Sequence, residues 1–286
     1  MDVIRTPTSI DGLSPRSVLK DGEGRTALRW SAISLVAVVW ISAAIFGLYI
    51  VAFYFGAVFD GTLDQWNHDL PRLHDPQNPL ATVGIGLHFA AGTVLLLLGP
   101  VQLIASVRQG VPGLHRWIGR FYVSAALLAG LGGLAFILLQ GTIGGPAMNA
   151  GFFLYGALTV IAAVQTVRHA RARRFELHRG WAIRLFALVI GSWLYRMDYG
   201  FWHMLAHAAG HTHTFDGPFD VVMDFFFFVP NLVVAEAFVR ARGLEAGSGL
   251  RAGASVLLSA AALFVAVASY YFTVYHWGPA ITKRLF

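Results

Sequence analysis

Long apolar stretches alternate with short polar ones along almost the whole chain. A bilayer core of roughly 30 Å requires about 20 mostly apolar residues for one helical crossing, and seven stretches meet that requirement. The sequence therefore predicts an all-α integral membrane protein with seven transmembrane helices, preceded by a polar segment over residues 1–29. The predicted helices cover residues 30–55, 80–105, 117–139, 147–168, 180–202, 219–240 and 252–277.

The distribution of basic residues predicts the orientation of these helices. If the amino terminus shares a side with the loops after the second, fourth and sixth helices, that side carries 17 of the 21 Lys and Arg residues. Only Arg72, Arg196, Lys283 and Arg284 fall on the other side. Because Lys and Arg next to a span resist translocation, we expect the amino terminus in the cytoplasm and the carboxy terminus outside.

The composition limits the chemistry that the chain can carry. Hydrophobic residues make up 56% of the chain and charged residues 13%, which excludes an ordinary soluble protein. The net charge of +6 does not indicate nucleic-acid binding, since the basic residues sit in short loops between apolar spans. With no cysteine, any metal or cofactor ligand must be histidine, carboxylate or methionine. No catalytic triad, phosphate loop or zinc-protease helix is found, so no catalytic residue is assigned.

An internal repeat relates two predicted helical hairpins. A shift of 63 residues aligns VQLIASVRQGVPGLHR (101–116) with VQTVRHARARRFELHR (164–179), including a His-Arg pair at the end of each copy. The repeat units would cover about residues 80–139 and 147–202. Two hairpins that start on the same side form a parallel repeat, for which a four-helix core of the second to fifth helices is the expected packing.

The two His-Arg sites resemble the signatures of a family of bacterial multi-pass membrane proteins, the domain of unknown function 2306 family. HRWIGRFYV at 115–123 resembles the first signature, and HRGWAIRLFAL at 178–188 with Arg196 beyond it resembles the second. Ala182 and Val189 stand where the family prefers Met and Thr. The resemblance spans roughly residues 80–240. It implies a multi-pass fold in the inner membrane and no established activity.

The paired histidines are candidate ligands of a b-type haem. Two neutral imidazoles that face each other from neighbouring helices, here His115 and His178, provide the axial ligands of a six-coordinate haem. Arg116 and Arg179 could then hold the propionates. The alternative is an interfacial role, in which Trp lies at the headgroup level, Arg binds lipid phosphate and His bonds exposed backbone groups.

A second histidine cluster, HMLAHAAGHTH, lies on the opposite side. If the helix continues beyond the membrane, His203, His207 and His211 share one helical stripe that suits Zn²⁺ or Cu²⁺. The alternative is a solvated or acid-sensing loop. His88, about two turns inside the second helix, could instead join His203 as a second haem ligand pair, or be a packed histidine bonded to a carbonyl.

Four charged residues are predicted to lie inside the membrane as two ion pairs. An antiparallel register that pairs Arg184 with Glu236 also pairs Arg196 with Asp224. Unpaired intramembrane charge costs several kcal/mol, so we expect at least one of the two salt bridges to form. Such pairs indicate either a proton or ion path or a structural clasp.

Two classes of function follow. The first is a b-type haem electron-transfer protein, whose redox partner would be a quinone-type molecule or another membrane subunit. The second is a non-enzymatic accessory, transport or assembly subunit with a periplasmic histidine metal site. The sequence decides neither for nor against an enzyme.

Overall fold

A computed structural model describes residues 15–69, 73–74, 76–77, 79–139 and 141–285, and its described part contains helices and no strand. Residues 1–14 of the predicted polar segment and Arg72 lie outside the described residues. Residues 15–29 continue the first long helix toward the amino terminus. The longest helices are α1 (Pro15–Tyr49), α4 (Pro79–Leu103), α6 (Pro112–Leu139), α7 (Gly145–Arg171) and α12 (Ser248–Phe272).

Shorter helices complete the fold. Two are π-helical turns that continue α1 and α12, η1 (Ile50–Phe55) and η3 (Thr273–Trp277). The others are α2 (Gly56–Asp60), η2 (Leu63–Gln65), α3 (Trp66–Asp69), α5 (Ala105–Gly110), α8 (Phe175–Val189), α9 (Gly191–Ala206), α10 (Pro218–Phe226), α11 (Val229–Ala241) and α13 (Gly278–Leu285).

Six helical stretches of the described residues are long and apolar enough to cross a membrane. Their outward side chains, such as Leu128 and Leu139, are 73% and 88% exposed, a surface that lipid rather than water would cover. The chain is therefore an all-α membrane protein. The six stretches are Gly22–Asp60, Thr82–Leu103, Pro112–Leu139, Gly145–Arg171, Pro218–Ala241 and Ser248–Leu285.

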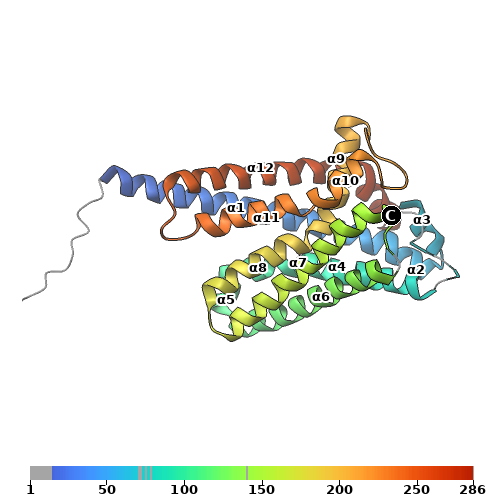
Figure 1. The fold of residues 1–286 in the computed structure, drawn as a ribbon, viewed down its shortest axis with the longest axis horizontal. Helices are drawn as coiled ribbons and strands as arrows, with labels where there is room; N and C mark the ends of the chain where they lie inside the picture. Colours follow the sequence, from blue (N-terminus) through green and yellow to red (C-terminus); the bar gives the residue numbers. More distant parts are fainter. Residues whose placement is uncertain (1–14, 70–72, 75, 78, 140, 286) are drawn as a thin grey trace, which may run out of the picture.

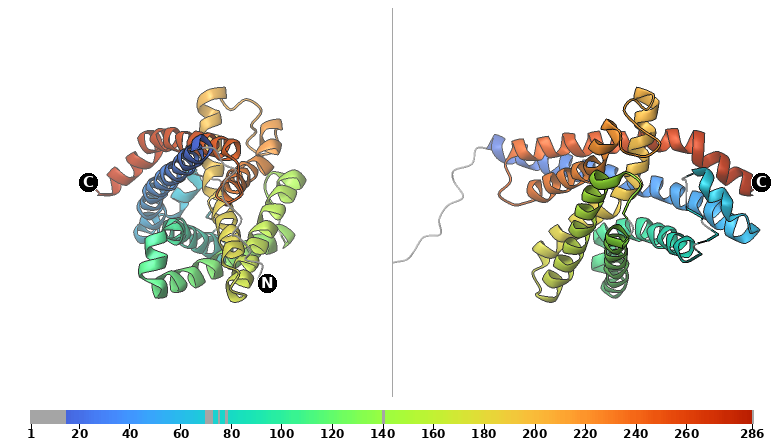
Figure 2. Two further views of the ribbon diagram at one scale, coloured as in Figure 1. Left: turned by 90° about the vertical axis from the view of Figure 1, so that its left-hand side faces the viewer. Right: turned by 45° about the vertical axis from the view of Figure 1, so that its right-hand side comes forward.

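The remaining predicted helix, 180–202, is divided into α8 and α9 at Ile190. The hydroxyl of Tyr155 on α7 donates a hydrogen bond to the Leu188 carbonyl at 2.9 Å, beside a Gly191-Ser192 pair. A side chain that inserts into the helical ladder and a Gly/Ser pair are both known causes of kinks. Beyond the kink, α9 turns away from the direction of its neighbours and packs on α12 (Figures 1 and 2).

The helices form two groups that pack side by side (Figure 1). In the first, α4 contacts α6, α6 contacts α7, α7 contacts α8, and α8 returns to α4, which closes a four-helix ring. Because α6 and α8 each touch both α4 and α7, they occupy opposite corners of the ring. In the second group, α12 packs along α1 and α11. Helix α10, which precedes α11, packs on α7 of the first group.

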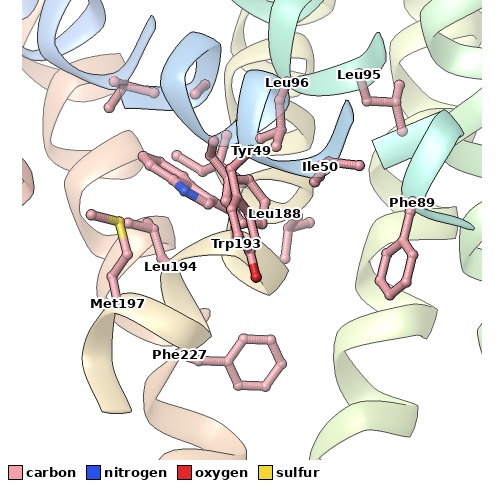
Figure 3. Packing of buried hydrophobic residues seen from close by; sticks show 14 of the residues in the cluster. Tyr49, Ile50, Phe89, Leu95, Leu96, Leu188, Trp193, Leu194, Met197 and Phe227 are labelled. Atoms are coloured by element: carbon pink, nitrogen blue, oxygen red, sulfur yellow. The ribbon is translucent and has the colours of Figure 1, made fainter. Parts of the chain in front are cut away.

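Figure 3 shows the apolar core in which the two groups meet. At its centre, Trp193 and Met197 of α9 are 1% and 0% exposed. Removal of a fully buried Trp side chain typically costs about 3–5 kcal/mol, so this contact contributes substantially to the joining of the groups. Around these two side chains lie Tyr49, Ile50, Leu95, Leu96, Leu188, Leu194 and Phe227.

The two ends of the molecule differ in the segments that they carry. We call the end with the start of α1, helix α5 and the turn between α7 and α8 the amino-terminal end. The opposite end carries α2, α3, the loop between α9 and α10, and α13 (Figure 1), and we call it the carboxy-terminal end.

Candidate functional site

The histidines of the two His-Arg pairs both lie at the amino-terminal end of the four-helix ring. His115 is the fourth residue of α6 and His178 is the fourth residue of α8. Since α6 and α8 stand at opposite corners, the two imidazoles come from opposite sides of the ring. His178 is also close enough to His115 for their charges to interact.

The ring of His178 is held in one orientation by α7. Its Nδ1 lies 2.9 Å from the carbonyl oxygen of Thr166, a buried residue. A carbonyl oxygen can only accept a hydrogen bond, so Nδ1 carries the hydrogen and the neutral ring has Nε2 as its free nitrogen. The half-buried imidazole therefore has a defined tautomer and a fixed direction.

His115 borders a group of buried polar atoms without partners in the described part of the chain. His115, Gly119 and Tyr122 share one face of α6, and an added Cβ at Gly119 would lie only 3.1 Å from Gln102 Oε1 of α4. The glycine therefore makes room for Gln102. Buried and unpartnered are the Nε2 of Gln102, the Nδ1 of His115 and the hydroxyl of Tyr122.

The arginines that follow the two histidines are exposed. Arg116 and Arg179 both lie at the surface of the amino-terminal end. Arg179 has further charge around it, with Arg108, Arg242 and Glu176 in electrostatic range. Neither guanidinium is committed to an ion pair that the structure describes, so both can bind an anionic group.

The histidine stripe predicted at the other end does not form. Helix α9 ends at Ala206, and His207 adopts a left-handed conformation with φ of 48°, so a continuous helix through His211 is wrong. The chain folds back and brings the ring of His211 to within 5.7 Å of the His203 ring, while His207 is exposed. No three His, Asp or Glu side chains gather as a metal site among the described residues.

His88 lies apart from both clusters. It is exposed on α4, and its ring packs against Phe89 at 6.1 Å. The ring of His203 instead lies against His211. The structure thus does not bring His88 and His203 together as a ligand pair.

One of the two predicted ion pairs is present. Arg184 of α8 contacts Glu236 of α11 through Nη2 at 2.5 Å and Nε at 3.0 Å. Arg240 reaches the other carboxylate oxygen at 2.7 Å, and the Arg184 guanidinium lies 5.2 Å above the Trp181 ring. These contacts fasten α8 of the ring to α11 of the second group, which fits the clasp interpretation.

The second predicted pair, Arg196 with Asp224, is not formed. Arg196 Nη1 donates to the Ser192 carbonyl within its own helix, at 3.2 Å. Asp224 is fully buried, and neither of its carboxylate oxygens has a hydrogen-bond partner among the described residues. Two breaks explain the difference, one at Ile190 between α8 and α9 and one at Phe227 and Phe228 between α10 and α11. Arg196 and Asp224 both lie beyond these breaks, so neither keeps the antiparallel register of α8 with α11.

The carboxylate with the most hydrogen bonds, Asp220, is not among the residues that the sequence pattern indicated. This fully buried side chain accepts hydrogen bonds from the Tyr199 hydroxyl at 2.7 Å and from the backbone N–H groups of Thr212 and Gly217, each at 3.0 Å. The Nδ1 of His211 lies 2.7 Å from the same carboxylate. The available signal was its place at the start of a helix after Gly217-Pro218, a usual capping position.

The fold and its two polar ends define a multi-pass helical membrane protein without a recognised catalytic motif. The model of one family, described as "Predicted membrane protein (DUF2306)", matches residues 85–239, more than half of the chain. The chain belongs to this family, as the resemblance at the two His-Arg sites indicated. The search of curated proteins and the search of solved structures each gave no match.

Proposed function

We propose that the protein is a b-type haem electron-transfer protein of the inner membrane, with His115 and His178 as the axial ligands. The supporting observation is that these histidines lie at the same end and on opposite corners of one four-helix ring. Axial ligands must reach a haem from its two faces, and opposite corners provide that approach.

The hydrogen bond from His178 Nδ1 to the Thr166 carbonyl supports the proposal. A metal-ligating imidazole nearly always donates its other N–H to a carbonyl, carboxylate or water, which fixes the tautomer and raises the basicity of the ligand. The bond to Thr166 does this for His178 and leaves Nε2 for iron.

The unpartnered polar atoms beside His115 are a second line of support. Buried polar groups in native proteins are nearly always hydrogen-bonded, so several orphans at one place indicate a missing ligand, ion or water. Haem carries two propionates as well as iron, and the exposed Arg116 and Arg179 are suited to hold carboxylates. Bound haem would supply reversible one-electron chemistry, and the protein would set its orientation and surrounding charge.

The charge distribution supports one orientation in the membrane. The amino-terminal end carries most of the Lys and Arg residues, and such residues are retained on the cytoplasmic side. With α8 and α9 together as a seventh, kinked crossing, the carboxy terminus lies in the periplasm and the haem in the cytoplasmic half. A quinone-type molecule in the lipid, or another membrane subunit, would be its redox partner.

The duplication of two hairpins is part of the same proposal. His115 and His178 have the same position in α6 and α8, and each hairpin supplies one adjacent pair of helices to the ring. A duplicated hairpin with one ligand in each copy would build a two-ligand site of approximate twofold symmetry.

The test is the absorption spectrum of the protein purified from haem-replete cells. The proposal predicts a Soret band with split bands on reduction, lost in His115→Ala and in His178→Ala. His276→Ala, at the other end of the molecule, is the matched control and should keep the spectrum. Equal spectra in all three variants would rule out the assigned ligands.

The competing function is that of an accessory, transport or assembly subunit, in which Arg116 and Arg179 bind lipid phosphate at the interface. Copurification of the same partner subunits from native membranes by the wild type and by both histidine variants would favour this function. A haem protein without partners would exclude it.

A further inference from the structure

Asp224 is a fully buried carboxyl group without a hydrogen-bond partner in the described residues. It lies on α10, within a candidate membrane span, and its backbone packs directly against Gly151 of α7. An isolated ionised carboxylate in such a place carries a large desolvation cost. The group must therefore be neutralised by something that binds to it.

A proton is the occupant that the surroundings of Asp224 favour. A metal ion would need several oxygen or nitrogen ligands, and no three acidic or histidine side chains gather at this place in the described part of the chain. Protonation requires no ligand shell. The titratable groups that face Asp224 are Asp220 from its own helix and Tyr195 from α9, with Arg196 acting on Tyr195.

A chain of hydrogen bonds leads from this region toward the carboxy-terminal end. Tyr195 is held between the rings of Phe152 and Phe227, at 5.5 and 5.2 Å, and its hydroxyl lies 3.2 Å from that of Tyr199. Tyr199 must donate its single hydrogen to the Asp220 carboxylate, so Tyr195 must donate to Tyr199. The hydroxyl hydrogens of both tyrosines therefore point along the hydrogen-bonded chain toward Asp220.

The chain of hydrogen bonds reaches the surface at His211. Its Nδ1 lies 2.7 Å from Asp220, and its side chain is 15% exposed. The backbone N–H groups of Thr212 and Gly217 hold the second oxygen of Asp220. The loop between α9 and α10 is thus built around the carboxylate that joins the buried hydroxyls to the surface.

We propose that Asp224 is a proton-binding site that exchanges with solvent through Tyr195, Tyr199, Asp220 and His211. Tyr195 and Asp224 are not directly hydrogen-bonded, and the proposal requires a bridging water there. In outward transfer the Asp224 O–H bond breaks, the water and each tyrosine oxygen gain one proton and lose one, and the Asp220 carboxylate gains one. When the His211 ring has its proton on Nε2, Nδ1 accepts this proton and the Nε2 proton passes to solvent.

The first test is infrared spectroscopy of the full chain in lipid vesicles at neutral pH. Wild type should show a protonated-carboxyl band that shifts on ¹³C labelling of aspartate and is absent from Asp224→Asn. Burial also raises the pKa of Asp198 on α9 to about 8, so Asp198→Asn is the matched control and should keep the Asp224 band. Absence of a shifting band from the labelled wild type would overturn the proposal.

The second test is the rate at which this carboxyl exchanges on transfer to D₂O. Tyr199→Phe keeps the ring and removes only the hydroxyl, and should slow the exchange by about a hundredfold, the usual contribution of a positioned proton relay. Tyr270→Phe, at a side chain 71% exposed on α12, is the matched control. Equal exchange rates in the two variants would overturn the path.

Discussion

The contact of α7 with α10 gives a sharp prediction for Gly151→Ala. An ideal Cβ on Gly151 would lie 2.2 Å from the carbonyl oxygen of Asp224 and 2.8 Å from its carbonyl carbon. Both atoms belong to the backbone and cannot rotate away, so α10 must move by roughly 1 Å. Such overpacking typically costs about 1–3 kcal/mol, against a gain of up to about 1 kcal/mol from helix propensity. We therefore expect Gly151→Ala to be less stable, by about 1–3 kcal/mol, than a helical Gly→Ala change that meets no close contact.

Gly133→Ala in α6 is the matched control, because nothing lies within 4 Å of the Cβ that it adds. It should leave the free energy of unfolding unchanged or raise it by up to about 1 kcal/mol. The assay is unfolding of both variants by sodium dodecyl sulfate titration in mixed micelles, followed by far-ultraviolet circular dichroism. Equal stability of Gly151→Ala and Gly133→Ala would refute the close approach of α7 and α10.

A further prediction concerns the ion pair that joins α8 to α11. A double-mutant cycle of Arg184→Ala and Glu236→Ala should give a coupling of about 1 kcal/mol in the free energy of unfolding, because both side chains are partly exposed and screened by solvent. A coupling of zero would contradict the interpretation of this ion pair as a structural clasp.

Hydropathy predicted the six candidate spans because a membrane helix requires only length and apolar character. The kink at Ile190 was not predictable in the same way. The hydroxyl that accompanies it belongs to Tyr155, on another helix, and the local signal was only the Gly191-Ser192 pair. Contacts between segments distant in sequence do not appear in a hydropathy pattern.

The contacts of the charged residues were likewise only partly predictable from the sequence. The antiparallel register predicted Arg184 with Glu236 correctly, because α8 and α11 stay aligned before the kink. The same register is wrong for Arg196 with Asp224, because it assumes straight helices through Ile190 and through Phe227 and Phe228, where the structure has breaks. The buried network of Asp220 depends on a left-handed backbone at His207, which no apolar periodicity indicates.

The haem content of the purified wild-type protein tests the central proposal most directly. Protein from haem-replete cells, assayed as the pyridine haemochrome against protein concentration, should contain about one haem per chain, consistent with one pair of axial histidines. A colourless preparation with an intact helical circular dichroism spectrum would contradict the proposal.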